Sequence, residues 1–309
     1  MKRQTVIVTG AAGFIGSALA NFLTKDYEVI GIDNLAAGDW SRCNPEVTVV
    51  QGDVSELCVD ELVELFEEVT FLFHLAAVKL HNQSNDSGTI SKTNIEGTRR
   101  IFEAASKAGV RKVIFTSSLY AYGSLGPSKM IERDPLIPFN FYGLSKSYGE
   151  SLLEMFARES KMDYAIARLF FIYGPWQYAE GGYKSVILKN FDNAINKLPL
   201  EVNGDGNQSL DYVYIDDCVE ILWDLAKSDF NGTVNVSSGV STSVNRIVEI
   251  IGTLSGALET KFNPRDWTHG SSRTGDIRLR EAILGPRQLT GIELGLEKIW
   301  NWTRAKKNS

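Results

Sequence analysis

Hydrophobic and polar positions form two kinds of segment along the first half of the chain. Short apolar runs rich in β-branched residues predict strands, and stretches with apolar residues at helical spacing predict helices between them. The predicted strands are 4–9, 28–32, 47–50, 71–75, 112–116 and 163–168, and the predicted helices are 14–24, 58–66, 91–108 and 143–159. Because strands and helices alternate, the pattern predicts a parallel sheet with crossover helices.

Two of the predicted strands are apolar at every position of their centres rather than at every second one. No polar side chain interrupts 71–73 or 113–115. Continuous apolar strands are typical of a parallel sheet with helices on both faces, because neither face meets water. The first half is therefore expected to be a doubly wound α/β sheet of the Rossmann type.

The alternation loosens beyond about residue 168. The glycines and prolines of 173–175 and 180–182 indicate loops, and 262–276 is also expected to be a loop. Further helices are predicted at 185–197, 216–227, 243–255 and 291–303, with a strand at 211–215.

The length of the chain allows two unequal domains, since its 309 residues exceed the usual size of one. We predict that residues 1–168 form the Rossmann domain and that 211–237 return to it. A smaller C-terminal α/β domain, 169–309, completes the predicted architecture.

Composition and charge exclude several classes of partner. With 43% hydrophobic and 23% charged residues the chain is typical of a globular protein, and its net charge of -6 gives no attraction to nucleic acid or an anionic membrane. The apolar run 5–8 is too short for a signal peptide or a membrane span, so we expect a cytoplasmic protein. Three cysteines without metal-ligand spacing predict reduced thiols and no metal site.

The most informative stretch is 9–16, TGAAGFIG, between the first predicted strand and helix. Glycines at three-residue spacing let the backbone approach a pyrophosphate, and the start of the helix offers unpaired N–H groups to its charge. The predicted cofactor contacts here are Gly10, Gly13, Phe14 and Ile15.

Carboxylates follow the next two predicted strands. Asp33, twenty residues after Gly13, is placed to bind both ribose hydroxyls and to repel a 2′-phosphate, which favours NAD over NADP. Asn34 and the absence of a nearby arginine favour NAD too. Asp53, followed by Val54, either meets the adenine edge or caps a helix.

A second group of residues contains candidates for proton transfer. Tyr142 and Lys146 are four residues apart, so the phenol and the ammonium share one face of a predicted helix. Moving the pKa of a tyrosine from about 10 to about 7 takes roughly 4 kcal/mol, which a nearby ammonium and a cationic nicotinamide can supply. Ser118 ends a predicted parallel strand, at the edge where ligands bind, and is the expected hydrogen-bond partner.

Together these motifs resemble the extended short-chain dehydrogenases, in particular the NAD-dependent nucleotide-sugar epimerase/dehydratase branch. The matching segments are 9–16, Asp33, 74–77, 94–98, Ser118 with 122–123, Tyr142 with Lys146, 168–175, 204–206, 214–217 and 273–276. The resemblance implies an NAD-binding first domain and a substrate-binding second domain. It adds Leu75, Ala76, Ala77, Lys79 and Asn94 to the cofactor contacts, with Tyr142 and Lys146.

Within that branch the chain looks most like UDP-glucose 4-epimerases, through Asp33, Asn34, Gly38 and Lys79. The residues after Ser118 are Leu119 and Tyr120. Sugar 4,6-dehydratases carry an Asp-Glu pair there and UDP-glucuronate decarboxylases a glutamate, so dehydration and decarboxylation are disfavoured.

Two positions depart from the family. Phe171 stands where Asn is usual and Leu210 where Arg is usual, both being positions that commonly hold the nucleotide diphosphate. Arg273 remains at the other diphosphate position, and Lys184 is a candidate replacement for the missing arginine. The predicted substrate contacts are Ser118, Leu119, Tyr120, Tyr142, Phe171, Lys184 and Arg273. The aromatic residues, with Trp176, either shape the sugar pocket or pack in the core.

The expected function is an NAD-dependent 4-epimerase of a nucleotide-diphosphate sugar. Tyr142 takes the proton of the sugar C4 hydroxyl, Lys146 stabilises the phenolate and Ser118 holds the 4-keto intermediate. An NDP-4-keto-sugar reductase or another sugar oxidoreductase uses the same motifs, and a non-catalytic NAD-sensing module is a remote third reading. The resemblance also implies a homodimer in which helices near 91–108 and 143–159 form a four-helix bundle.

Overall fold

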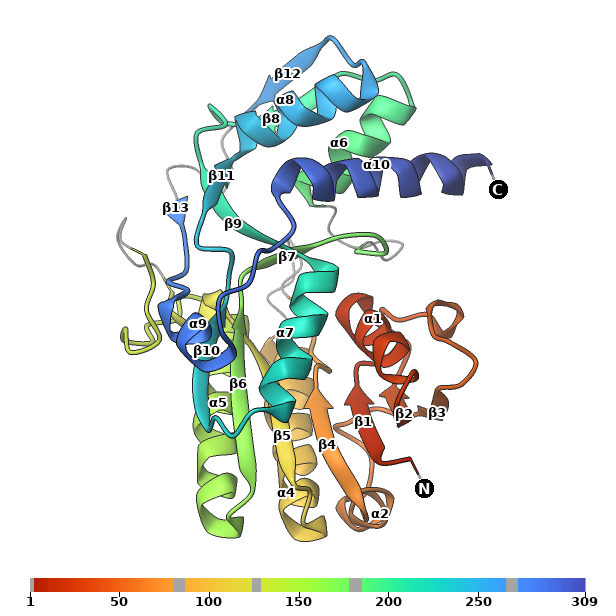
Figure 1. Cartoon of the computed structure of the whole chain (residues 1–309), viewed down its shortest axis with the longest axis vertical. Helices are drawn as coiled ribbons and strands as arrows, with labels where there is room; N and C mark the ends of the chain where they lie inside the picture. The colour runs from red at the N-terminus through yellow and green to blue at the C-terminus, as the bar shows by residue number, and fades with distance from the viewer. Residues whose placement is uncertain (1–2, 80–86, 124–128, 178–184, 265–271, 309) are drawn as a thin grey trace.

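A seven-stranded parallel sheet forms the lower part of the molecule in the computed structural model (Figure 1). The structure describes residues 3–79, 87–123, 129–177, 185–264 and 272–308. The strands are β1 (Thr5–Thr9), β2 (Glu28–Asp33), β3 (Thr48–Gln51), β4 (Val69–His74), β5 (Lys112–Ser118), β6 (Asp163–Leu169) and β10 (Gly232–Val236). Their order is β10-β6-β5-β4-β1-β2-β3, which confirms the doubly wound sheet.

Helices cover both faces of this sheet. On one face α1 (Phe14–Leu23) packs against α7 (Ile215–Lys227), and on the other α2 (Val59–Leu65), α4 (Thr98–Ala108) and α5 (Phe141–Ser160) lie side by side. Successive residues of one strand therefore enter different cores: Phe71 and Phe73 belong to the first cluster and Leu72 to the second. This is why the centre of β4, 71–73, is apolar at every position.

Among the described residues, the upper part of the molecule contains two small sheets and three helices. One sheet comprises β7 (Phe171–Tyr173), β9 (Ser209–Tyr214), β11 (Ser241–Ser243) and β13 (Ser272–Arg273), and the other pairs β8 (Leu200–Asn203) with β12 (Thr260–Asn263). The helices are α6 (Val186–Ile195), α8 (Val244–Ser255) and α10 (Ile292–Asn308), whereas α9 (Arg278–Leu284) lies beside β10 of the lower sheet (Figure 1). The prediction of an uninterrupted loop over 262–276 is wrong at both ends, because two short polar strands lie there.

The segment 211–237 is shared between the two parts. β9 lies in the upper sheet, whereas α7 packs on the lower sheet and β10 pairs with β6 at its edge. The assignment of 1–168 to the cofactor and 169–309 to the substrate stays a prediction.

Several short helical segments connect the larger elements. They are η1 (Trp40–Arg42), α3 (Ser87–Ile90), the π-helix η2 (Ser91–Gly97) and η3 (Leu119–Ala121). The predicted helix 91–108 therefore begins with a wider turn before it continues as α4. Such π-helical turns often accompany functional sites.

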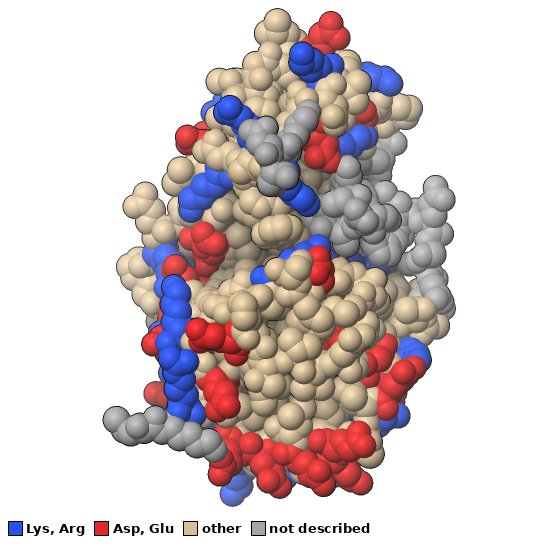
Figure 2. Space-filling view, turned by 90° about the vertical axis from the view of Figure 1, so that its right-hand side faces the viewer, with Lys and Arg blue, Asp and Glu red and all other residues tan. Residues whose placement is uncertain are grey.

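None of the helices in the described residues combines the length and the apolar character that crossing a membrane requires. Figure 2 shows acidic side chains gathered at the lower end of the molecule, where α2 lies, and Asp60, Glu61 and Glu64 of that helix are exposed.

A buried ion pair fastens α5 to β6. The guanidinium of Arg168 donates to both carboxylate oxygens of Glu150, with its Nη2 2.6 Å from Oε2 and its Nε 2.9 Å from Oε1. Each side chain is 5% exposed. The ring of Tyr122 lies 4.6 Å from the guanidinium carbon, and the Ser117 hydroxyl donates to Glu150. The pair thus holds α5 against the ends of β5 and β6.

We predict that Glu150→Ala lowers the free energy of unfolding by about 3–5 kcal/mol, because it leaves the Arg168 charge buried without its carboxylate. Glu249→Ala is the matched control, since the Arg246–Glu249 pair on α8 is exposed and its loss should cost about 1 kcal/mol or less. Denaturant titration measures both variants. Equal losses in the two would show that the Glu150 pair does not carry this stability.

Candidate active site

The loop between β1 and α1 forms a tight, glycine-dependent turn. Gly10 has φ +70°, and a Cβ there would stand 2.8 Å from the backbone nitrogen of Ala76. The N-cap of α1 is Gly13, and no side chain caps this end of the helix. The first-turn amides, including those of Phe14 and Ile15, are therefore left for a ligand, and their geometry suits a phosphate anion.

Asp33 ends β2 beside this loop. Its Oδ2 accepts a hydrogen bond from the Ala12 amide at 3.0 Å, and its Oδ1 accepts one from the Leu35 amide at 2.8 Å. Burial raises the pKa of Asp33, and the hydrogen bonds from Leu35 and Ala12 and the charge of Arg42 oppose this rise. Each oxygen keeps acceptor capacity for a hydroxyl group, so the carboxylate fits a ribose.

Asp53 links the ends of β2 and β3. Its Oδ2 accepts from the Asn34 side chain at 2.8 Å, and its Oδ1 accepts from the Ser55 amide at 2.9 Å. The alternative that Asp53 caps a helix is wrong, because α2 begins at Val59 and its N-cap is Cys58; Asp53 instead closes a turn with Ser55. The contact of Asp53 with the adenine stays a prediction. Val54 is 3% exposed and lies beneath Gly97, where a Cβ would stand 2.7 Å from it.

A buried hydroxyl network fixes the segment after β4 against the glycine loop. The Thr9 hydroxyl oxygen accepts from the amides of Leu75 and Ala76, each at 3.2 Å, so its own proton goes to His74 Nδ1 at 2.7 Å. His74 Nε2 then carries the ring proton and donates it to Thr98 at 3.0 Å. Burial, with a smaller effect from Lys146, lowers the pKa of His74 to about 3.

Asn94 holds the same segment from the other side. Its amide accepts from the backbone N–H of Val78 at 2.7 Å, donates to the Val78 carbonyl at 3.0 Å and donates to Ser145 on α5 at 3.0 Å. Asn94 is 2% exposed, so its observed role is to fasten 75–79 to α5. Ala77 and Lys79 lie in this fastened segment. The Lys79 side chain has solvent contact, yet the protein atoms around its ammonium lower its pKa.

Tyr142, Ser118 and Lys146 converge at the carboxyl end of β5. Asn140 caps α5 by accepting from the Gly143 amide at 2.7 Å, and Gly143 packs directly against the backbone of Tyr120. This close approach brings the first turn of α5 to the end of β5. Lys146 Nζ donates to the Thr116 carbonyl at 2.9 Å and lies 5.8 Å from the centre of the Tyr142 ring.

Burial governs the ionisation of both groups. It raises the pKa of Tyr142 to about 12, against a hydrogen bond with Ser118 that lowers it. Burial, with a smaller effect from the charge of Lys79 and against the charge of Glu150, lowers the pKa of Lys146 to about 7. An ammonium that titrates near neutrality beside a buried phenol is an arrangement suited to proton transfer.

An aromatic and guanidinium cluster adjoins Tyr142. The Tyr120 ring lies 5.9 Å from the Tyr142 ring, and the guanidinium carbon of Arg273 lies 5.6 Å from Tyr120 and 5.7 Å from Phe139. The structure thus brings together Tyr120, Tyr142 and Arg273. Sequence reasoning missed Phe139, whose side chain is 52% exposed. The sequence signal for it is an aromatic residue directly after Pro138 and three residues before Tyr142.

Arg273 is positioned by backbone pairing. β13 pairs with β9 so that Arg273 lies opposite Leu210, and the neighbouring Thr274 carbonyl accepts from the Met130 amide at 2.9 Å. The buried Asp211 carboxylate, which sequence reasoning also missed, accepts from the Gly275 amide at 3.1 Å. These bonds fix the strand that carries Arg273.

The remaining predicted substrate residues are placed differently. Leu119 is 1% exposed and packs with Tyr122, so it lies beneath the surface of the site. Phe171 begins β7, and its ring lies 6.0 Å from that of Tyr212. Lys184 lies outside the described residues.

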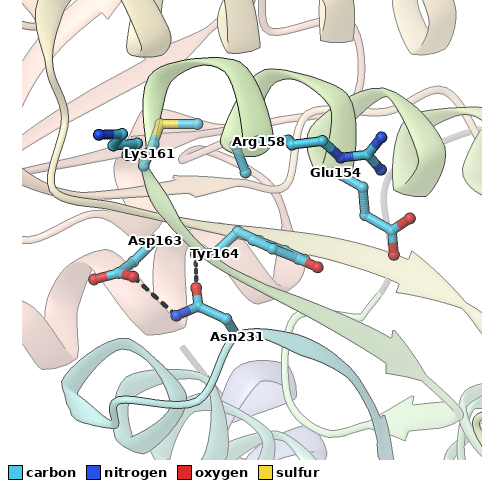
Figure 3. Close-up of a pocket in the computed structure, with 8 residues that line it drawn as sticks. Glu154, Arg158, Lys161, Asp163, Tyr164 and Asn231 are labelled. Carbon is cyan, nitrogen blue, oxygen red and sulfur yellow. Dashed lines mark hydrogen bonds between the residues drawn. The ribbon is translucent and has the colours of Figure 1, made fainter.

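A surface hollow at the other end of α5 is separate from this site. Figure 3 shows it between the end of α5 and the start of β6, where Asn231 donates to Asp163 at 2.8 Å and accepts from the Tyr164 amide at 2.7 Å. Arg158 in its wall is about 24 Å along the helix from Tyr142. The hollow therefore takes no part in the chemistry of Tyr142.

Known proteins share this sequence and architecture. Residues 6–237 match the model of the NAD dependent epimerase/dehydratase family. A putative UDP-glucose 4-epimerase of Methanocaldococcus jannaschii is 32% identical over 309 residues, with 97% of this chain and 98% of the relative covered. Two solved structures, each 28% identical, superpose with TM-scores of 0.92 and 0.90.

The first of these structures is a UDP-N-acetylglucosamine 4-epimerase from Methanobrevibacter ruminantium M1 in complex with UDP-N-acetylmuramic acid, and the match covers 99% of this chain and 100% of that one. The second is a UDP-glucose 4-epimerase from Thermotoga maritima with UDP-glucose, and the match covers 98% and 99%.

We predict that His74 makes stability depend on pH. The unfolded chain protonates His74 below about pH 6.5, whereas the folded chain does so only near pH 3. Its contribution is therefore complete above about pH 6.5 and is lost as the pH falls, by up to about 1.4 kcal/mol per pH unit.

Denaturant midpoints between about pH 7 and about pH 4 measure this effect, with His74→Gln as the comparison. The variant should be less stable near neutrality but should lose less stability on acidification than the wild type. Parallel curves would mean that His74 is not kept neutral by the fold.

Proposed function

Because this chain belongs to the NAD-dependent epimerase/dehydratase family, we propose that it is a nucleotide-sugar 4-epimerase. The observation that supports this function most directly is that Tyr142, Ser118 and Lys146 converge beside the glycine loop. The turn that follows Ser118 supplies Leu119 and Tyr120. Since neither side chain is an acid, this turn favours epimerisation over elimination or decarboxylation.

The residues fit NAD. The Gly10 turn excludes a Cβ, the start of α1 offers amides to the pyrophosphate, and Asp33 offers carboxylate oxygens to the ribose. A buried carboxylate at Asp33 also disfavours the extra phosphate of NADP. When bound, NAD supplies the acceptor and then the donor of a hydride.

The chain itself supplies the proton transfer. Tyr142, as phenolate, accepts the proton of the sugar C4 hydroxyl while the C4 hydrogen leaves as hydride, and Ser118 donates a hydrogen bond to the ketone oxygen that results. Protonated Lys146 and the positive charge of bound NAD would stabilise the phenolate, lowering the pKa of Tyr142 from the value of about 12 that burial gives it. The reverse transfer to the other face of C4 returns the proton from Tyr142 and inverts the centre, so the enzyme ends unchanged.

The nucleotide diphosphate is the proposed partner of Arg273. A guanidinium can bind phosphate oxygens in a bidentate manner, and this one is held beside Tyr142 by Tyr120 and Phe139. UDP-sugars are the first candidates, because the three relatives named above are UDP-sugar 4-epimerases, one of them putative.

A sugar oxidoreductase is the second candidate, in particular a reductase of NDP-4-keto-sugars. It is favoured by Phe171 and Leu210, which replace the polar residues usual at two diphosphate positions. Leu210 lies directly opposite Arg273 in the sheet, so an apolar side chain stands there where the family usually has an arginine. A non-catalytic NAD sensor is disfavoured, because Tyr142 and Lys146 are both retained in working proximity.

We predict that the purified protein inverts C4 of a UDP-sugar without net conversion of NAD. The test incubates it with UDP-, GDP-, CDP- and dTDP-sugars and follows the sugar by NMR and the cofactor by absorbance. Stoichiometric conversion of cofactor would instead establish the oxidoreductase.

Tyr142→Phe should lower turnover about 10²- to 10⁴-fold, because it removes the general base. Tyr164→Phe is the matched control, since Tyr164 lies at the opposite end of β6 and should keep wild-type turnover. Unchanged turnover in Tyr142→Phe would exclude the proposed base.

We further propose that the protein forms a homodimer through α5. Four exposed apolar side chains follow its outer face: Phe141, Leu144, Tyr148 and Met155. With Ser151 they repeat at alternating spacings of three and four residues, the pattern of a helix-packing seam. The adjacent α4 presents a charged row that includes Arg99 and Glu103. Two copies that pair these helices would form a four-helix bundle.

Leu144→Glu should convert this dimer to monomer, because it places a charge in the seam. Leu258→Glu, on a 96% exposed leucine of the upper part, is the matched control and should leave the dimer intact. Light scattering measures both. A wild-type monomer, or a dimer that survives Leu144→Glu, would contradict the proposal.

A further inference from the structure

Four aromatic and basic side chains meet where the two parts of the molecule adjoin. Trp176 follows β7, and its ring lies 5.2 Å from that of Trp302 on α10. Lys306, one turn further along α10, places Nζ 5.2 Å from the Trp176 ring and 5.6 Å from the Trp302 ring. From the lower part, the guanidinium carbon of Arg42 lies 5.8 Å from the Trp176 ring. We call these four residues the Trp176 clasp.

The backbone of Trp176 is strained. Its φ is +65°, in the left-handed region that bulky residues rarely adopt. Such conformations persist only where the surroundings impose them, and they cluster at functional positions. The side chain is 41% exposed, so core burial does not explain the strain. This backbone conformation places the Trp176 ring in contact with α10 and with Arg42.

Arg42 belongs to the loop that flanks the cofactor residues. Its carbonyl accepts from the Asn21 side chain on α1 at 2.8 Å, and the Asp39 amide of the same loop donates to the Ala12 carbonyl at 2.9 Å. Ala12 in turn donates to the Asp33 carboxylate at 3.0 Å. A loop held at Arg42 therefore holds both the glycine turn and the ribose-binding carboxylate.

α10 supplies the other end of this connection. It crosses the upper part of the molecule toward the side on which α1 lies (Figure 1). Its inner face is anchored by Leu296 and Ile299, both 0% exposed in the first core cluster. Trp302 and Lys306 thus extend from a fixed helix, and Trp176 joins them to the loop of Arg42.

We propose that the Trp176 clasp retains the dinucleotide by pinning the Arg42 loop to α10, which keeps the adenosine half of the cofactor site closed. Release of the dinucleotide requires this loop to move away from Asp33, and the contacts of Trp176 oppose that movement. The inference concerns cofactor release and is independent of the sugar reaction.

The test measures the rate at which bound NADH leaves the full-length protein. The protein is loaded with NADH and chased with excess NAD, and the fall of NADH fluorescence gives the rate without any sugar. Trp176→Gly deletes the ring and suits the left-handed backbone, and Arg42→Gln removes the cation. Each variant should release NADH about three- to tenfold faster, the effect of losing one or two such contacts.

The double variant decides whether the two residues act together. If the clasp is correct, Arg42→Gln adds little once Trp176 is glycine, because residues that act through one contact are not additive. A direct effect of Arg42 on Asp33 would instead multiply the two rates. Trp176→Phe and Arg42→Lys keep a ring and a cation, so both should release NADH at nearly the wild-type rate.

Wild-type release rates in both single variants, or effects that multiply in the double variant, would overturn the proposal. Melting of the cofactor-free proteins controls for folding. If Trp176→Gly destabilises the cofactor-free protein, Trp176→Leu replaces it in the single and double variants: release effects of Trp176→Leu and Arg42→Gln that do not multiply support the clasp, and effects that multiply overturn it.

Discussion

The buried ammonium of Lys146 is the constraint around which the site is arranged. An amine in such surroundings is costly to charge, and its pKa accordingly falls to about 7. The Thr116 carbonyl, 2.9 Å away, and the Phe115 ring, 4.9 Å away, give the ammonium its two closest favourable contacts. Glu150, one turn further along α5, adds a negative charge that Arg168 largely balances. The protein therefore holds Lys146 beside Tyr142 in surroundings that disfavour its charged form.

The lower sheet and the chemistry at its edge could be predicted because both are local in sequence. Each strand of that sheet from β1 to β6 coincides with one of the predicted apolar runs, and Gly10 and Gly13 fall between the first run and α1, with Gly16 in the first turn of that helix. Tyr142 and Lys146 share a helix face by their spacing alone. Since parallel strands end at one edge, Ser118 and Asp33 had to lie on the same side of the sheet. Periodicity and topology are enough for these placements.

The contacts around Arg273 could not be predicted from the sequence, because short segments that are distant in the chain form them. β13 has two residues and β11 has three, and both are polar, so neither carries a periodic signal. Arg273 reaches Tyr120 and Phe139 only through backbone pairing with β9 and Met130. The strain at Trp176 is likewise invisible in sequence, because Gly174 and Pro175 indicate a turn there but not its handedness. Asn94 was expected at the cofactor, yet the structure shows it fastening the segment before Lys79 to α5.

One helix connects the chemistry with the proposed assembly. On α5 the inward row Tyr142, Lys146 and Glu150 repeats every four residues, while Leu144, Tyr148 and Met155 follow the outward face. A helix with both faces committed cannot turn about its axis without disturbing one of them. Packing of a second copy against the outward face would therefore restrict rotation of the inward row, and with it the separation of Lys146 from Tyr142. The Coulomb interaction of the two groups depends on that separation. Pairing of α5 helices would therefore keep the ionisation of Tyr142 and Lys146 constant, although the paired face of α5 does not contact the substrate.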